Sequence, residues 1–196
     1  ALSSGICDQI SQIDSFARLM ELWDSEDEDI ITRTAGLVWN LSANGDPMRE
    51  LLADAGAADI LVSFVKNSED YAPETVSNVL MCLSVLSASK KIGAIVRDLK
   101  GLEKVAELVD YENEEEDPEN RVALAAVSAV WNLSHPNENK EIFQKLGIVE
   151  KILNFLDASE SVEALEKVCG ALLTLGSSPA ISEDFRSQNG FNSLKI

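Results

Sequence analysis

The chain has 196 residues, 45% of them hydrophobic, which is enough for a hydrophobic core of ordinary size. Its 16 Lys and Arg residues against 34 Asp and Glu residues give a formal net charge of −18. This charge disfavours binding to nucleic acids and to anionic membranes, and it favours a protein or peptide partner of basic character. No apolar run reaches the ~18 residues that a membrane span needs, so we expect no membrane insertion.

The first helices are predicted within residues 1–44. Apolar residues recur at helical spacing over residues 6–10, 16–23 and 30–41, with a junction near Ile13. The third of these segments ends in the phrase Trp-Asn-Leu-Ser. This part of the chain is less regular than the units that follow.

Residues 45–88 show the same order more clearly. Asp46 is a good N-cap for a first helix, and the proline that follows it suits the first helical position. Gly56 then predicts a break where the chain needs a tight turn. The apolar residues between 60 and 65 share one face of a second helix, and those between 76 and 86 belong to a third.

Two further units follow in residues 89–135 and 136–178. Each begins with a short amphipathic segment, and Gly101 and Gly147 mark the junctions to the second helices. A fifth unit begins within residues 179–196, so that the chain holds four units and the start of another.

The phrase Trp-Asn-Leu-Ser occurs twice, and its asparagines, Asn40 and Asn132, are 92 residues apart. Degenerate copies stand at residues 83–87 and 172–176, so the unit is 42–47 residues long. A repeat of this length that contains only helices is typical of a helical solenoid. Solenoids are mostly binding scaffolds, so the pattern favours binding over catalysis.

Residues of common catalytic and metal sites are scarce. His135 is the only histidine and no Cys-x-x-Cys motif occurs, so neither a zinc site nor a Ser–His or Cys–His pair is predicted. Phosphate-binding glycine motifs are also absent, and we therefore expect no cofactor and no enzymatic activity. Cys7, Cys82 and Cys169 lie within apolar helical patterns, which predicts reduced, buried thiols in an intracellular, cytoplasmic protein.

The stretch from Val127 to Lys140 resembles an armadillo repeat. It combines the Trp-Asn-Leu-Ser phrase with Asn-x-Asn-Lys at residues 137–140, and Gly-Ile-Val follows at residues 147–149. The similarity extends over the whole chain, and the order of three helices in each unit favours armadillo over HEAT repeats. The resemblance implies an all-α fold, a right-handed α–α superhelix in which residues 1–196 form a single domain.

In armadillo proteins the third helices line a concave groove, where a ladder of asparagines binds the backbone of an extended peptide. A carboxamide has both a donor and an acceptor, so it holds a peptide unit without reading its side chain. Asn40 and Asn132 match the ladder, whereas Val85 and Thr174 replace it in the other two units. A continuous grip on a peptide is therefore not expected. The resemblance implies as partner-binding residues Arg33, Trp39, Asn40, Asn78, Trp131, Asn132 and Lys167.

Two other positions of the third helix separate this chain from known armadillo groups. Importin-α-like members carry a tryptophan four residues before the ladder, where this chain has Gly36, Met81, Ser128 and Gly170. β-Catenin-like members use basic groove residues to bind acidic partners. Seven residues before the ladder stand Arg33, Asn78, Ala125 and Lys167. Two basic residues at these four positions are too few to predict that the groove binds acidic partners.

Several of these residues have two interpretations. Trp39 and Trp131 precede the ladder position by about 100° of helical rotation, so each either packs in the core or contacts a partner at the groove edge. The two asparagines either face the groove or bond within the solenoid. The acidic runs at residues 24–29 and 112–117 are either solvated loops or an edge that steers a basic partner. Acids near the start of a third helix also suit its dipole.

These features predict a non-enzymatic adaptor that binds a partner segment in the concave groove of an armadillo solenoid, in signalling, polarity, adhesion or cytoskeletal assembly. The alternative is a structural or autoregulatory segment of a larger protein. Its groove would then hold the protein's own tail or another copy, since open solenoid ends permit self-association.

Overall fold

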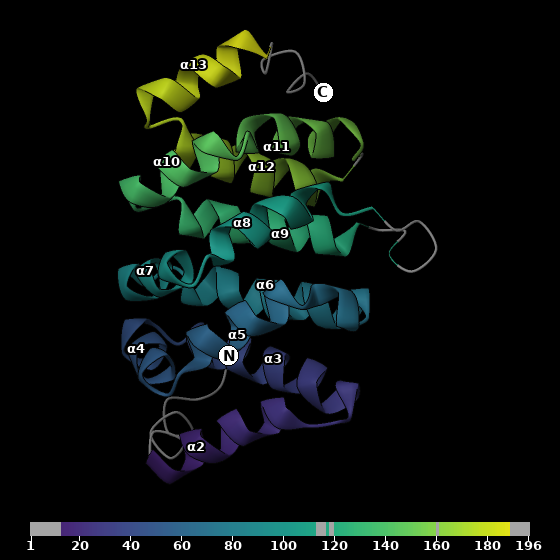
Figure 1. The fold of residues 1–196 in the computed structure, drawn as a ribbon, viewed down its shortest axis with the longest axis vertical. Helices are drawn as coiled ribbons and strands as arrows, with labels where there is room; N and C mark the ends of the chain where they lie inside the picture. Colours follow the sequence, from purple (N-terminus) through teal and green to yellow (C-terminus); the bar gives the residue numbers. More distant parts are fainter. Residues whose placement is uncertain (1–12, 113–116, 118–119, 160, 189–196) are drawn as a thin grey trace.

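The computed structural model describes residues 13–112, 117, 120–159 and 161–188. Within these ranges all regular structure is helical, and the helices stack in chain order along one long axis (Figure 1). This arrangement confirms the predicted all-α solenoid. Among the described residues, no helix combines the length and apolar character that crossing a membrane requires.

The helices follow one another in groups that we call units, with three helices in the second, third and fourth units and two described helices in the first. The first unit contains α2 (Ile13–Glu21) and α3 (Glu28–Ser42), the second α4 (Asp46–Asp54), α5 (Ala57–Lys66) and α6 (Pro73–Leu86), the third α7 (Lys90–Asp98), α8 (Gly101–Glu107) and α9 (Arg121–Leu133), and the fourth α10 (Asn137–Lys145), α11 (Ile148–Asp157) and α12 (Val162–Leu175). The helix α13 (Pro179–Ser187) comes last. Short 3-10 helices follow the second helices at η1 (Leu22–Asp24), η2 (Ser68–Asp70) and η3 (Leu108–Asp110). The predicted segment 6–10 lies outside the described residues.

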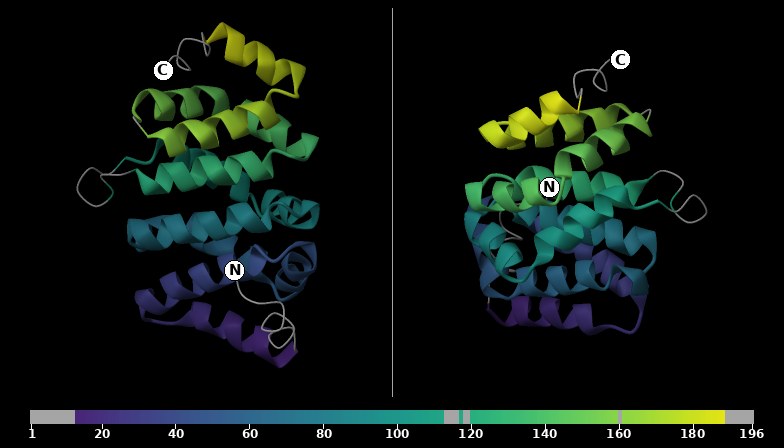
Figure 2. Two further views of the ribbon diagram at one scale, coloured as in Figure 1. Left: turned by 180° about the vertical axis from the view of Figure 1, so that it is seen from behind. Right: turned by 45° about the horizontal axis from the view of Figure 1, so that its top comes forward.

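The third helices of the units form one layer. The helix α3 packs on α6, α6 on α9 and α9 on α12, and the rear view in Figure 2 shows them as parallel rungs. The first helices α4, α7 and α10 lie one above another at one edge (Figure 1). A continuous core runs between the third helices and the other helices, and Leu61, Leu80 and Val105 are fully buried in it. Burial of such an apolar face stabilises each helix far more than its intrinsic propensity does.

Glycines open the second helices in two different ways. Gly56 and Gly147 adopt left-handed backbone with φ of 85° and 67°, which confirms the predicted breaks. At the third unit the left-handed residue is Lys100, with φ 58°, and not the predicted Gly101. Gly101 is required for packing instead, because a Cβ there would lie 2.9 Å from Cγ1 of Val96.

The expected N-cap at Asp46 is wrong by one residue. The helix α4 begins at Asp46, and Gly45 with φ 105° is its N-cap. The Asp46 carboxylate accepts a hydrogen bond from Arg49 Nη2 at 2.7 Å, so it is engaged one turn further along the helix. The N-cap of α3 is Asp27, whose side chain accepts from the backbone N–H of Asp29 at 3.0 Å.

The first acidic run is more than a solvated loop. Glu28 Oε1 accepts hydrogen bonds from the backbone N–H of Ala72 at 2.7 Å and from Thr75 Oγ1 at 2.6 Å. Both donors belong to the start of α6, so a side chain of the first unit caps a helix of the second. In the second acidic run, residues 113–116 lie outside the described residues.

A buried asparagine joins the third and fourth units. Asn139 is fully buried, and its Nδ2 donates to the carbonyl oxygens of Leu133 at 2.9 Å and Gly93 at 3.3 Å. Its Oδ1 accepts from Arg97 Nη1 at 3.2 Å. Leu133 ends α9, where helical carbonyls lack intrahelical partners, so Asn139 satisfies an acceptor that would otherwise be unpaired.

The three cysteines differ in their surroundings. Cys82 is buried on α6, and burial raises the pKa of its thiol. Cys169 on α12 is exposed, so the prediction that it is buried is wrong. No described third helix covers the outer side of α12, which leaves an apolar helical pattern facing outward. Cys7 lies outside the described residues, and His135 is exposed.

Candidate partner-binding groove

A groove crosses the layer of third helices. It has a volume of about 560 Å³ and draws side chains from α3, α6, α9 and the start of α12. Its lining consists of Trp39, Ser77, Asn78, Met81, Arg121, Leu124, Ala125, Ser161 and Glu163. The lining is thus apolar around the tryptophan and polar or charged toward the beginnings of the helices.

The two tryptophans of the repeated phrase have different roles. Trp39 is 39% exposed and lines the groove beside Met81 of the next unit. Trp131 is partly buried and lies so close over Gly170 of the next unit that a Cβ there would be 2.6 Å from its ring. Trp39 therefore lies at the groove edge, whereas Trp131 packs mainly against the solenoid. Gly170 gives the Trp131 ring room to pack on α12, whereas the corresponding residue of α6 is Met81, which lines the groove with Trp39.

Gly170→Ala is expected to destabilise the protein by about 1 kcal/mol, because the new methyl group must displace the Trp131 ring. Gly36→Ala is the matched control, since Gly36 holds the same place in α3 and no described atom lies within 4 Å of its Cβ position. There the change should stabilise α3 by ~0.5–1 kcal/mol through helix propensity. Thermal unfolding of both variants measures the contrast, and equal shifts would show that the ring does not rest on Gly170.

The two ladder asparagines are both engaged within the solenoid. Asn40 is exposed, and its Nδ2 donates to the carbonyl oxygen of Gly36 at 2.8 Å, one turn earlier in α3. Asn132 is half-buried, and its Nδ2 donates to Ser84 Oγ on α6 at 3.0 Å. Ser84 Oγ in turn donates to the carbonyl oxygen of Ser128 at 2.7 Å. These two hydrogen bonds lie across the interface between α6 and α9.

Only two of the seven predicted contact residues meet in the groove lining, namely Trp39 and Asn78. Arg33 is exposed but lines a separate hollow of about 310 Å³ between the starts of α3 and α6. Lys167 lies outside the lining, with its Nζ 3.6 Å from Glu166 Oε1. Asn40, Trp131 and Asn132 are also outside the lining.

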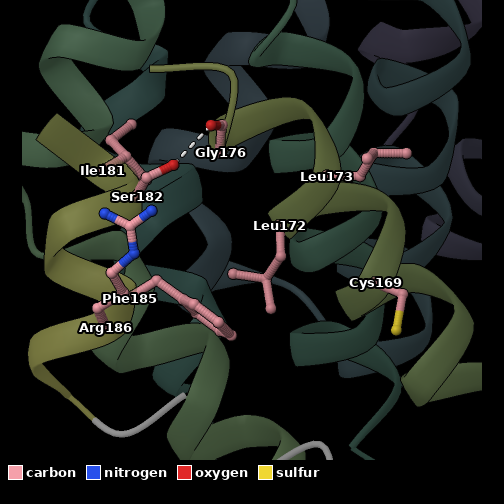
Figure 3. Close-up of a pocket in the computed structure, with 8 residues that line it drawn as sticks. All are labelled: Cys169, Leu172, Leu173, Gly176, Ile181, Ser182, Phe185 and Arg186. Carbon is pink, nitrogen blue, oxygen red and sulfur yellow. Dashed lines mark hydrogen bonds between the residues drawn. The ribbon is translucent and has the colours of Figure 1, made fainter. Parts of the chain in front are cut away.

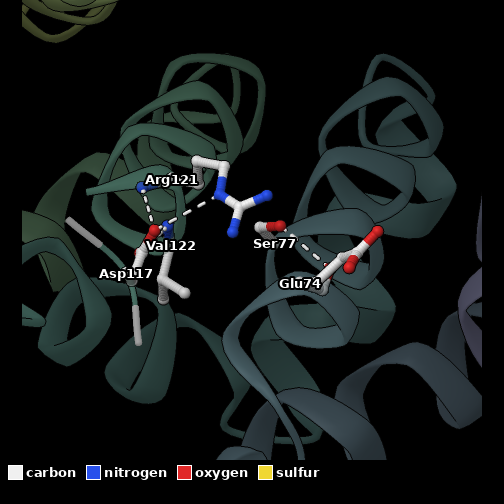
Figure 4. Close-up of polar contacts among 5 residues, drawn as sticks. All are labelled: Glu74, Ser77, Asp117, Arg121 and Val122. Atoms are coloured by element: carbon white, nitrogen blue, oxygen red, sulfur yellow. Dashed lines mark hydrogen bonds and ion pairs between the residues drawn. The ribbon is translucent and has the colours of Figure 1, made fainter. Parts of the chain in front are cut away.

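Sequence reasoning missed Arg121 and the carboxylate that holds it. Asp117 is fully buried and accepts from the backbone N–H groups of Arg121 at 3.0 Å and Val122 at 2.9 Å, so it caps α9. Arg121 Nε lies 3.4 Å from the same carboxylate. Figure 4 shows the two terminal nitrogens of Arg121 pointing across the gap toward Ser77 and Glu74 of α6. A charged group is therefore held in place at the groove.

A spacing in the sequence predicts a row of charged residues that includes Arg121, which we call the charged row. Eleven residues, three turns of a helix, separate Arg121 from Asn132, so the two share a face. The same step back from the ladder position in the other units reaches Asp29, Glu74 and Glu163. All four residues are exposed. The row is thus acidic except at the third unit.

Comparisons with known proteins bear on the fold. No protein-family model matches the chain, and no curated protein is similar to it. Among solved structures, a crystal structure of an engineered protein aligns with 98% of this chain and 75% of its own at a TM-score of 0.82 and 19% identity. A designed armadillo repeat protein in complex with the peptide (KR)4 aligns with 96% of this chain and 85% of its own at a TM-score of 0.74 and 16% identity.

A third similar structure is that of computationally designed armadillo repeat proteins for modular peptide recognition. It aligns with 96% of this chain and 86% of its own at a TM-score of 0.72 and 17% identity. At these identities the likeness concerns the fold alone. The chain therefore has the armadillo-type repeat fold, a right-handed α–α superhelix.

Proposed function

We propose that the protein is a non-enzymatic adaptor whose concave groove binds a segment of a partner protein. The observation that carries this proposal is a groove of about 560 Å³ that crosses the third helices and contains a tryptophan 39% exposed. A large aromatic ring held open to solvent beside polar groups is a frequent anchor of protein interfaces. The armadillo-type fold is also commonly used for peptide binding, as in the designed relative with bound peptide.

The partner segment is proposed to be basic. Three of the four residues in the charged row are acids, Asp29, Glu74 and Glu163, and the whole chain has a net charge of −18. One Lys or Arg stem can lie on the face of Trp39, while other basic residues of the segment approach these carboxylates. Arg121 breaks the row, so we place a neutral or acidic partner residue opposite it.

The segment is proposed to be short. Four third helices at a spacing of about 9–10 Å span roughly 30 Å, which an extended chain covers with about nine residues. Because Asn132 already bonds to Ser84, a continuous backbone ladder is not part of the proposal. The proposed contacts are centred on Trp39 and Asn78. The remaining members of the proposed set are Arg33, Asn40, Trp131, Asn132 and Lys167.

The wider setting is an inference from the family resemblance and the composition. We propose a cytoplasmic role in which the adaptor recruits its partner during signalling, polarity, adhesion or cytoskeletal assembly. Such a role needs reversible association, and the acids of the charged row would speed the encounter with a basic segment.

The test is a titration with labelled (KR)4 and with (ED)4, its reversed-charge counterpart. Wild type should bind (KR)4 at least tenfold more tightly than (ED)4 at low salt, as charge complementarity requires. Glu163→Gln, in the groove lining, should weaken (KR)4 binding about threefold, as expected for one partly exposed ion pair.

The matched control is Glu150→Gln. Glu150 is an exposed acid on α11, outside the groove lining, and its replacement changes the net charge by the same amount. This variant should bind (KR)4 almost as tightly as wild type. If both variants lose the same affinity, the peptide is held by the overall charge and the groove proposal fails.

A further inference from the structure

The same two positions of the third helices meet at the α6–α9 and α9–α12 interfaces. The residue one before the ladder position reaches onto the residue four before the ladder position in the next unit. Trp131 lies over Gly170, and Ser84 Oγ donates to the carbonyl oxygen of Ser128. We call the side of a third helix that holds the first of these positions its donor side, and the side that holds the second its receiving side. The α6–α9 and α9–α12 interfaces each join a donor side to a receiving side.

The donor side of α12 is open. Leu173 holds the place that Trp131 holds in α9, and it is 80% exposed. Beside it, α12 and α13 enclose an apolar pocket of about 310 Å³, into which Leu172 and Phe185 point (Figure 3). The residues 42 positions earlier than Cys169, Leu172 and Phe185 are Val127, Val130 and Phe143, and all three are completely buried. Inside the solenoid, this face is covered by the following unit.

The receiving side of α3 is open as well. Gly36 holds the place of Gly170, and no described atom lies within 4 Å of its Cβ position. Ile30 and Leu37 on the same side are each 39% exposed. Their counterparts 45 residues later are Thr75 and Cys82, which are 2% and 0% exposed, and those 92 residues later are Val122 and Ala129, both 0% exposed.

We propose that these two faces bind each other, so that a second copy of the chain stacks end to end on the first. Leu173 of one copy would lie over Gly36 of the next, as Trp131 lies over Gly170 within a chain. Such an interface joins unlike faces and leaves both outer ends free, so it propagates into linear chains as concentration rises.

A second copy fits these faces because each already packs on the other type of face inside the solenoid. The interface would thus continue the α6–α9 and α9–α12 packing with the same geometry. The net charge of −18 opposes association of identical chains. Salt screens this repulsion without weakening apolar contacts, so end-to-end stacking should strengthen with salt, whereas binding of a basic peptide should weaken.

The test is sedimentation velocity of wild type, Leu37→Glu and Leu173→Glu over a range of protein concentrations at about 0.5 M salt, where the Debye length falls to a few ångströms. Wild type should form complexes that grow with concentration. Each variant alone should associate at least tenfold more weakly, because one of its two faces carries a charge. A 1:1 mixture of the two variants should form dimers and nothing larger, since one intact face of each type remains.

The matched control is Leu51→Glu, which adds the same charge at a residue of α4 that is 39% exposed and lies on neither face. It should assemble like wild type. Circular dichroism checks that all variants fold. A monomeric wild type at every concentration, assembly of Leu37→Glu alone, or loss of assembly in Leu51→Glu would each overturn the proposal. Binding of (KR)4 to Leu173→Glu reports on the groove independently, so the two proposals fail separately.

Discussion

Asn139→Ala is expected to lower the free energy of unfolding by about 3 kcal/mol, the largest stability effect that we predict for a single polar side chain. The change leaves the carbonyl oxygens of Leu133 and Gly93 without the Nδ2 donor that they share. It also removes the acceptor of Arg97 Nη1. Each buried polar group left unpaired costs roughly 1–3 kcal/mol, and no water has ready access to a side chain that is 0% exposed.

Denaturation by guanidinium chloride, followed by circular dichroism, measures this loss. Asn154→Ala is a suitable control because Asn154 is an exposed residue of α11, where the same change should alter stability by less than ~0.5 kcal/mol. Equal effects of the two substitutions would mean that the α7–α9–α10 network does not hold the third and fourth units together.

Trp39→Ala is expected to weaken binding of (KR)4 by about tenfold or more, while the free energy of unfolding falls by about 1–3 kcal/mol. The ring supplies most of the apolar area at one end of the groove, together with Met81 and Leu124. Because the residue is 39% exposed, its replacement removes less packing than the loss of a fully buried tryptophan would, and the variant should remain folded. The substitution leaves the net charge unchanged, so any lost affinity reports on the groove itself.

Fluorescence anisotropy with labelled (KR)4 measures the affinity, and Leu51→Ala serves as the control. Leu51 has the same exposed fraction of 39% but lies on α4, outside the groove lining. Its replacement should leave the affinity within about twofold of wild type. If Trp39→Ala also binds like wild type, the peptide does not use this groove, and the proposed function would have to be assigned to another surface.

The fold was predictable from the sequence because the same local sequence features recur in each unit. Apolar residues at helical spacing, glycine junctions such as Gly56 and Gly147, and two copies of Trp-Asn-Leu-Ser together define helical units of similar length. A unit of this kind cannot bury its apolar face alone, so its recurrence already requires stacking. Local pattern and global fold therefore agree, and the armadillo-type solenoid follows.

The candidate site was predictable only in part, because its residues depend on neighbours from other units. Trp39 and Trp131 occupy the same position of the repeated phrase. The Trp131 ring packs closely over Gly170 of the next unit, whereas Trp39 lines the groove together with Met81 of the next unit. Likewise, Asn132 meets Ser84 across a helix interface that no local pattern reveals.

The sequence by itself determined the repeat, the helices, the all-α class and the acidic charge, since each depends on residues close together in the chain. Only the tertiary structure decided that Asp117 is buried as the cap of α9, that Arg121 reaches the groove and that Cys169 is exposed. These outcomes depend on which side chain of one unit lies opposite which side chain of the next. Burial and hydrogen bonding across that interface are set by three-dimensional contact between units, which helical periodicity within a unit does not specify.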